Sequence, residues 1–262
     1  MTSGWIPMDG GGFTPPSTED FNFSGLMNGA AWLNKPMLQL VISVILIAVV
    51  FVWGSRNLQI VPGKRQWTFE FLYDYIRNTV GRDVIGRDYQ KWMPLLFPMF
   101  LLIIVNNWFG EFFYFMFPTF SNIGYVYGLV ILVFVLFIGV GIKAHGIAYF
   151  KLATAPADVP KLLWIIIIPL EILSTFVVRP VTLSVRLFAN MFAGHMSVLV
   201  FIGGGTYLLT YANNILFNVS GGLSWVLGMA IIGLELFIGY LQAYVFTILT
   251  AQYIASSINV GH

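Results

Sequence analysis

A run of 41 mostly apolar residues, 162–202, limits the folds open to this chain more than any other feature. As one helix it would be about 60 Å long, roughly twice the thickness of the hydrocarbon core of a bilayer, so it cannot be a single upright transmembrane helix. Pro169 and Pro180 mark places where the run can bend. The run therefore predicts a strongly tilted or hairpin-like helical element.

Two arginines, Arg179 and Arg186, lie seven residues apart inside this run. An arginine at the centre of a bilayer costs from about 3 to more than 10 kcal/mol, so such a residue usually marks a functional site that faces a partner or a wet cavity. Snorkelling to an interface is the alternative, but it reaches only near helix ends, and apolar sequence flanks both arginines. On a helix the two arginines share a face with small and polar residues, namely Thr182, Asn190, Ala193 and Ser197.

The composition of the whole chain agrees with a membrane protein. Hydrophobic residues make up 58% of the sequence and charged residues only 9%, whereas about a quarter of a soluble domain is charged. We predict an all-α polytopic membrane protein with five or six hydrophobic helices. A single transmembrane domain, residues 36–262, would follow an N-terminal arm, residues 1–35, that has neither the apolar core of a signal peptide nor an arginine-rich presequence.

Five apolar segments long enough to cross a bilayer follow the arm. They are residues 37–53, 93–117, 125–142, the tilted element 162–202 and the last helix 223–254. Between the first two, aromatic and aliphatic residues recur at helical spacing against charged ones, which predicts an amphipathic helix in the membrane interface over residues 66–82. An ordinary solvated charged loop is the alternative there.

The basic residues are distributed unevenly among the connections. The loop after the first segment holds seven of the thirteen lysines and arginines, and the connection 143–161 holds three lysines. The connections 118–124 and 203–222 hold none. Because an excess of Lys and Arg is typical of cytoplasmic or matrix loops, we predict that the N-terminus lies outside and the C-terminus inside.

The sequence RPVTLSVRLFANMFAGH, residues 179–195, resembles the arginine motif of subunit a of F-type ATP synthases, the stator that faces the rotating ring of c subunits. The similarity in the order of hydrophobic segments extends from residue 37 to the C-terminus. The resemblance implies that the tilted element belongs to a helical hairpin packed along the c-ring. It also implies subunit b of the peripheral stalk and the lipid bilayer as partners, and a bacterial plasma membrane or mitochondrial inner membrane as location.

The resemblance further implies that Arg186 and Gln242 lie side by side on antiparallel helices. From that level His195 lies about 13.5 Å outward along one helix and Glu235 about 10.5 Å outward along the other, at nearly one depth. A histidine and a carboxylate at one depth form a plausible proton relay reached from outside. Some bacterial relatives are similar but carry the two groups exchanged, which preserves the pair. Taken alone, His195 would be interpreted as a packing histidine.

Other polar residues are candidates for two aqueous half-channels that would load and unload protons on the c-ring carboxylates. Glu171 is a candidate for the inner half-channel, or else a carboxylate that tethers the inner interface. Asn190 and Arg179 belong to the polar helix face that also carries Arg186. Asn107 and Glu111, near the outer end of their segment, are candidates for the channel entrance.

The sequence has no nucleotide-binding loop of the GxxxxGK[ST] type, no HExxH motif and no cysteine. We therefore expect no catalytic residue, cofactor or metal site in this chain, H⁺ as the transported ion, and no nucleic-acid partner. ATP chemistry would belong to other subunits. Two alternative functions stay open, namely a self-contained membrane transporter or channel and a membrane subunit of a respiratory complex.

Overall fold

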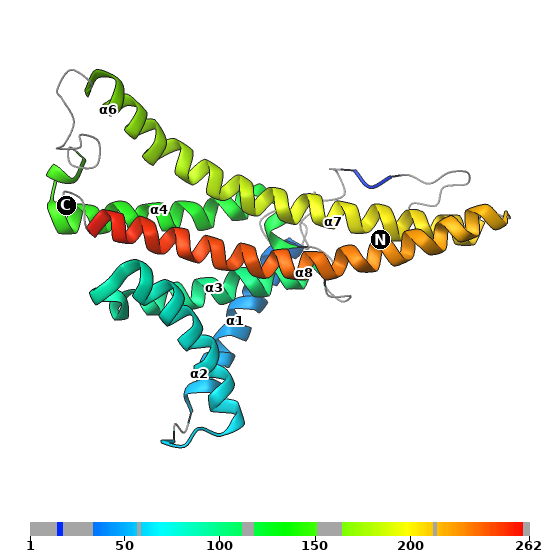
Figure 1. The fold of residues 1–262 in the computed structure, drawn as a ribbon, viewed down its shortest axis with the longest axis horizontal. Helices are drawn as coiled ribbons and strands as arrows, with labels where there is room; N and C mark the ends of the chain where they lie inside the picture. Colours follow the sequence, from blue (N-terminus) through cyan, green and yellow to red (C-terminus); the bar gives the residue numbers. More distant parts are fainter. Residues whose placement is uncertain are drawn as a thin grey trace. The chain divides into compact units, whose positions relative to one another are not determined.

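The structure is a computed structural model that describes residues 15–17, 34–56, 59–111, 118–150, 164–211 and 214–258. Within these ranges every regular element is a helix and no strand occurs, as the ribbon in Figure 1 shows. The predicted all-α fold class is therefore confirmed. Most of the predicted N-terminal arm, residues 1–35, lies outside the described residues.

Five helical stretches in the described part of the chain are long and apolar enough to cross a membrane. They are Lys35–Ser55, Lys64–Glu111, Ile123–His145, Trp164–Tyr211 and Ile215–Ile258. The first is helix α1, the third is α4 and the last is α8, whereas the second and fourth each join several elements. This number agrees with the five or six hydrophobic helices expected, and the chain is a polytopic membrane protein.

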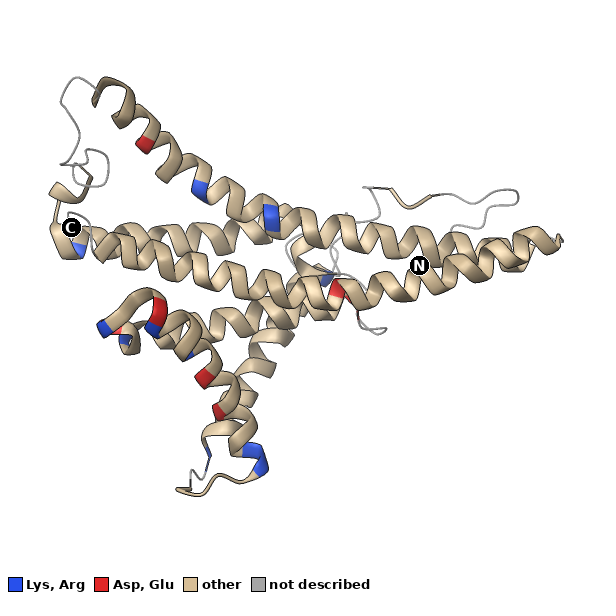
Figure 2. Cartoon of the chain, viewed as in Figure 1, with Lys and Arg blue, Asp and Glu red and all other residues tan. Residues whose placement is uncertain are grey.

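The second stretch joins a charged helix to an apolar one. Helix α2 (Lys64–Ile76) continues through a π-helical segment, η2 (Arg77–Ile85), and a short turn, η3 (Gly86–Asp88), into α3 (Tyr89–Glu111). Gly86 has a φ of +80°, a conformation that favours glycine where the chain changes direction. Figure 2 shows that charged residues gather on α2, η2 and η3 and are sparse on the long helices. The position of this charged part in a membrane interface stays a prediction.

The fourth stretch contains the predicted tilted element. Helix α6 (Trp164–Ile172), the π-helical segment η6 (Leu173–Val178) and helix α7 (Arg179–Tyr211) follow one another without a break. The stretch has 48 residues and so a length of about 70 Å, more than twice the hydrocarbon thickness, which requires a strong tilt if the whole stretch lies in a bilayer. Residues 162–163 of the predicted element lie outside the described residues.

A helical hairpin is formed by α7 and α8, where the sequence predicted a loop over residues 203–222. The glycines of that segment are helical and serve close packing: a Cβ on Gly205 would lie 3.0 Å from the carbonyl oxygen of Gly221. The Ser224 hydroxyl also donates a 2.7 Å hydrogen bond to the carbonyl of Phe201. The two helices therefore extend the hairpin because small residues let their backbones approach.

The chain divides into two compact units that both draw on the long helices. The first comprises Met1–Val41, Asn106–Asn122 and Phe188–Tyr240, and the second comprises Ile42–Val105, Ile123–Leu187 and Leu241–His262.

The core of the second unit is built around Phe97 of α3, which is 1% exposed. Its ring meets those of Phe51, Phe69 and Tyr73 edge-on, with centroid distances of 5.3, 5.7 and 5.3 Å. These aromatic contacts pack α1 and α2 against α3. Edge-to-face aromatic pairs stabilise such a core beyond the area that they bury.

The end of α8 is fastened to the end of α4 within the second unit. The Nε2 atom of His145 lies 3.1 Å from the carbonyl oxygen of Ile258, one of the last carbonyls of α8, which lack partners inside the helix. The hydroxyl of Tyr149 lies 3.4 Å from that of Ser257. A Cβ on Gly141 would overlap the Tyr149 ring, so this glycine leaves the space that the tyrosine fills.

Candidate functional site

A buried carboxylate of α8 lies against α7, one residue along the chain from a buried histidine. Glu235 of α8 is 6% exposed and His195 of α7 is 3% exposed. A Cβ built on Gly194 would overlap the Glu235 carboxylate, so the carboxylate lies directly against the α7 backbone, one residue from His195. The structure thus places Glu235 against the residue that precedes His195, whereas the shared membrane depth of the two groups stays a prediction.

Helix α3 adds two hydrogen bonds to the turn of α8 that follows Glu235. The side-chain amide of Asn107 donates to the carbonyl of Gly239 at 3.0 Å, and the indole of Trp108 donates to the carbonyl of Leu236 at 3.1 Å. Asn107 is fully buried, and the absence of a side chain at Gly239 lets it approach. These bonds fix α3 against α8 beside the carboxylate.

A second carboxylate completes this group. Glu111 is the last residue of α3, one helical turn beyond Asn107, and Glu235 lies one turn before Gly239, which Asn107 contacts. We call the set Asn107, Trp108, Glu111, His195 and Glu235 the histidine–carboxylate cluster. Three helices contribute to it, and all of its members belong to the first unit.

The cluster has spare hydrogen-bonding capacity. Oε2 of Glu235 and Oδ1 of Asn107 are buried and have no hydrogen-bond partner among the described residues. Buried polar atoms are normally paired, and exceptions call for a water, an ion or a catalytic role. A carboxylate with a free oxygen beside a histidine can accept and release a proton.

Arg186 differs from these buried groups because it is exposed on α7. Within the described ranges it makes no ion pair with any carboxylate. Gln242 of α8 is 6% exposed, and its amide nitrogen donates no hydrogen bond to Arg186 or to any other described residue. The nitrogen of the half-buried Asn190 amide likewise has no partner there. Among the described residues, therefore, no carboxylate neutralises the guanidinium of Arg186.

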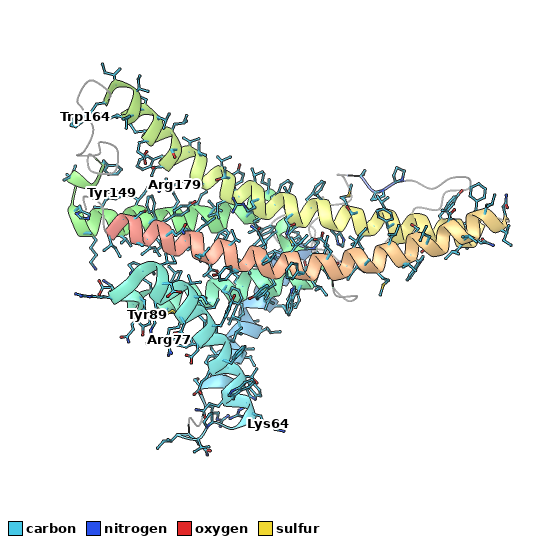
Figure 3. All side chains as sticks on the ribbon, in the orientation of Figure 1. Lys64, Arg77, Tyr89, Tyr149, Trp164 and Arg179 are labelled. Carbon is cyan, nitrogen blue, oxygen red and sulfur yellow. The ribbon has the colours of Figure 1, made fainter. Side chains whose placement is uncertain are left out.

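Arg179, labelled in Figure 3, does have partners. Its Nη2 lies 3.9 Å from Oε1 of Glu171, and both side chains are about one-third exposed. Its guanidinium also lies over the ring of Tyr253 on α8, 5.5 Å from the centroid. The two arginines that the sequence placed on one face are therefore engaged differently, since Arg179 is held by its own chain.

The described residues provide no metal site: no three His, Asp or Glu side chains in those ranges gather closely enough to hold an ion. The chemistry that the described side chains support is proton binding and charge stabilisation.

Comparison with known proteins decides the family. The family model described as ATP synthase A chain matches residues 37–255. The ATP synthase subunit a of Nocardioides sp. is 41% identical over 266 residues, which cover 97% of this chain and 96% of that protein. The ATP synthase subunit a of Pseudarthrobacter chlorophenolicus is 44% identical, with 96% and 95% covered, and that of Mesorhizobium japonicum is 36% identical, with 84% and 86% covered.

The chain belongs to the ATP synthase subunit a family. The predicted family and function are confirmed: the protein is a proton-translocating subunit of the Fo sector and a component of a rotary complex that contains other subunits.

Several residues of this subunit a site were not singled out from the sequence. In the sequence Gly194 is one residue of the motif at 179–195. That it leaves room for the Glu235 carboxylate depends on α8 packing against it, which the sequence does not show. Trp108 follows two asparagines in an apolar segment. An indole N–H at membrane depth needs a hydrogen-bond acceptor, so the sequence did contain a signal for this residue. Tyr253 gave no signal, because it meets Arg179 only through the packing of α8.

Proposed function

We propose that this subunit provides two aqueous half-channels that load and unload protons on the carboxylates of a c-ring and thereby couple proton flow to rotation. The observation that carries the proposal is the Glu235 carboxylate, which is buried against Gly194 beside His195 with one oxygen unpaired among the described residues. Ionisable groups are retained at membrane depth for such relays despite their cost.

The histidine–carboxylate cluster would form the end of the outer half-channel. A proton would pass Asn107 and Glu111 at the entrance and reach the pair of His195 and Glu235. Each of the two carboxylates offers a group that can accept and release a proton along this path. Such a site takes up a proton readily and passes it on.

Arg186 would separate the two half-channels. Arginine side chains stay protonated in proteins, so this residue acts through its charge and does not carry protons. A cation within about 4 to 6 Å lowers the pKa of a carboxylate by about 1 to 3 units, so a protonated ring carboxylate that reaches Arg186 would release its proton. The exposure of Arg186 supports this role because no group of the described chain neutralises it.

The inner half-channel would begin beyond Arg186, with Gln242 beside the arginine and Glu171 further along the path. The ion is H⁺, and each proton that crosses about 100 mV releases about 2.3 kcal/mol. The partners are the c-ring, subunit b of the peripheral stalk and the lipids of a bacterial plasma membrane. No catalytic residue or cofactor belongs to this chain, so ATP chemistry takes place on other subunits.

The test of this function uses vesicles that contain the whole ATP synthase. Glu235→Gln keeps the shape of the side chain but removes its proton-binding site, and it should slow ATP-driven acidification about ten-fold or more. Glu70→Gln on α2 makes the same chemical change at a residue that does not belong to the cluster and should leave acidification unchanged. Unchanged acidification by an assembled Glu235→Gln complex would refute the relay. Purification of the subunit from the membrane without an associated c-ring would refute the proposal that the c-ring is its partner.

The orientation can be tested separately because the natural chain has no cysteine. Arg87→Cys on η3 and Ile215→Cys at the start of α8 both introduce a thiol at an exposed position. A membrane-impermeant maleimide should label Arg87→Cys only from the cytoplasmic side and Ile215→Cys only from the outside. The opposite result for either variant would overturn the orientation.

A further inference from the structure

Glu171 and Arg179 are eight residues apart, and yet their charged atoms approach to 3.9 Å. On an α-helix eight residues advance by about 800°, which leaves the second side chain about 80° round the helix from the first. A regular α-helix would therefore direct the two side chains to different faces. The contact needs a local change in the helix.

The segment between the two residues supplies that change. Leu173–Val178 is π-helical, and the backbone N–H of Arg179 bonds to the carbonyl of Ser174, five residues back. One π turn takes up one residue more than an α turn, so eight residues that include it advance about as far as seven α-helical residues, about 700°. Glu171 and Arg179 are then only about 20° from alignment.

The cause of the π turn is the proline that follows it. Pro180 has no backbone N–H, and in a regular helix its ring would clash with the carbonyl of Phe176, four residues back. A wider turn directly before the proline moves that carbonyl aside. The proline and the carboxylate are thus linked, because relief of the clash at Pro180 sets the face on which Glu171 lies.

Neighbouring contacts hold the aligned pair in place. Thr175 lies four residues from each partner, is 3% exposed, and donates from its hydroxyl to Oε1 of Glu171 at 3.4 Å. On the other side, the ring of Tyr253 covers the guanidinium of Arg179. Arg179 is therefore directed toward its own chain.

We propose that the π turn before Pro180 and the side chain of Arg179 together position the Glu171 carboxylate in the inner proton path. Arg179 is then a positioning residue that acts through Glu171 and does not face the rotor as a second Arg186. The inference rests on the proposed role of Glu171 in the inner half-channel. It adds that the helical register between residues 171 and 179 is a functional feature.

The test compares a deletion with an insertion in the assembled ATP synthase. Deleting Val177 in a chain that also carries Pro180→Ala removes the clash at residue 180 and leaves Glu171 and Arg179 seven residues apart, a spacing that a plain α-helix aligns without a π turn. Inserting one alanine after Val177 places them nine residues apart and separates their faces. ATP-driven acidification should stay within about two-fold for the deletion and fall at least about five-fold for the insertion. A deletion as damaging as the insertion, or one that prevents assembly, would overturn the proposal.

Conservative and non-conservative substitutions at Arg179 give a second readout. Arg179→Lys keeps a cation that can reach Glu171 and should retain at least about half of the acidification rate, whereas Arg179→Gln should lose about five-fold. If only the contact of the guanidinium with Tyr253 mattered, the two variants would be similar, because neither carries a guanidinium. Equal rates for Arg179→Lys and Arg179→Gln would therefore overturn the positioning role.

A structural measurement separates this inference from the proposed function. A cryo-EM density map of the complex with Val177 deleted and Pro180→Ala should show a continuous α-helix in which Glu171 and Arg179 remain in contact. A map in which they separate would overturn the register argument. If Glu171→Gln leaves acidification unchanged while the map shows the pair intact, the role of Glu171 in the inner half-channel is wrong and the geometry of the register stands.

Discussion

The histidine–carboxylate cluster and the arginine segment, Glu171 to Arg186, hold their charged groups by different means. In the cluster three helices enclose Glu235, and its position depends on Gly194 and on hydrogen bonds from α3 to the α8 backbone. In the arginine segment the contact of Glu171 with Arg179 comes from the geometry of one helical stretch. Glu235 is 6% exposed, whereas Glu171 and Arg179 are about one-third exposed.

This difference indicates what each region tolerates. A buried site made by close helix packing is sensitive to a single methyl group, because packed interiors do not relax freely. A partly exposed pair on one helix is sensitive to register and to the sign of its charges, and solvent screening reduces its contribution to stability. Four substitutions test this contrast, and the largest effect is expected for the exposed arginine.

Arg186→Ala should abolish ATP-driven acidification and ATP synthesis while it permits a passive proton leak. The fixed charge that releases the proton from the ring carboxylate, and that repels protons between the half-channels, would be gone. The measurement is proton flux in vesicles with and without ATP. Arg179→Ala, which removes a paired arginine, should do less. Vesicles with Arg186→Ala that still couple ATP hydrolysis to acidification would contradict the contrast between the two arginines.

His195→Ala should slow ATP-driven acidification about ten-fold or more, because a positioned proton-transfer group contributes about 10² to 10⁴ in rate in typical sites. His145→Ala is the matched control, since that histidine contacts the end of α8 in the other unit. Its acidification rate should stay near normal. Equal slowing by the two substitutions would show that burial, and not proton transfer, explains the effect of His195.

Gly194→Ala adds one methyl group where the Glu235 carboxylate lies. Overpacking of this kind costs about 1 to 3 kcal/mol, so we expect acidification to fall several-fold and α7 and α8 to separate locally. Gly222→Ala on α8 is the control, because a Cβ there meets no atom within 4 Å. An assembled Gly194→Ala complex that pumps as well as Gly222→Ala would break the claim that tight packing positions the carboxylate.

The smallest effect is expected for Trp108→Phe, which removes the hydrogen bond to the carbonyl of Leu236. Such an interhelical bond contributes about 0.6 kcal/mol on average in membranes. Trp225→Phe removes the comparable 3.1 Å bond to the Thr206 hydroxyl, away from the cluster. Both variants should lower the thermal stability of the complex equally, but only Trp108→Phe should slow acidification, by about two-fold. Equal acidification rates for the two variants would show that Trp108 has no specific role in the cluster.

Two features of the structure could not be predicted from the sequence, namely the helical glycines between residues 203 and 222 and the π turn before Arg179. Apolar runs identify the hydrophobic helices, but the sequence predicts a loop over residues 203–222, the connection between two apolar segments that lacks basic residues. In the structure those glycines continue α7 and α8, since Gly205 and Gly221 let the two backbones approach. Similarly, periodicity at 100° per residue placed Arg179 on the face of Arg186 but could not show the π turn that gives Arg179 its own partner.

The sequence by itself determined the class of the protein, its family and the identity of its ionisable groups. Length and polarity of a segment fix whether it can span a bilayer, and a charge inside an apolar run is costly wherever the run packs. Only the tertiary structure decided that Glu235 lies against Gly194 and that Trp108 reaches α8. These contacts join residues up to 128 positions apart, and they depend on how helices pack, which local sequence does not encode.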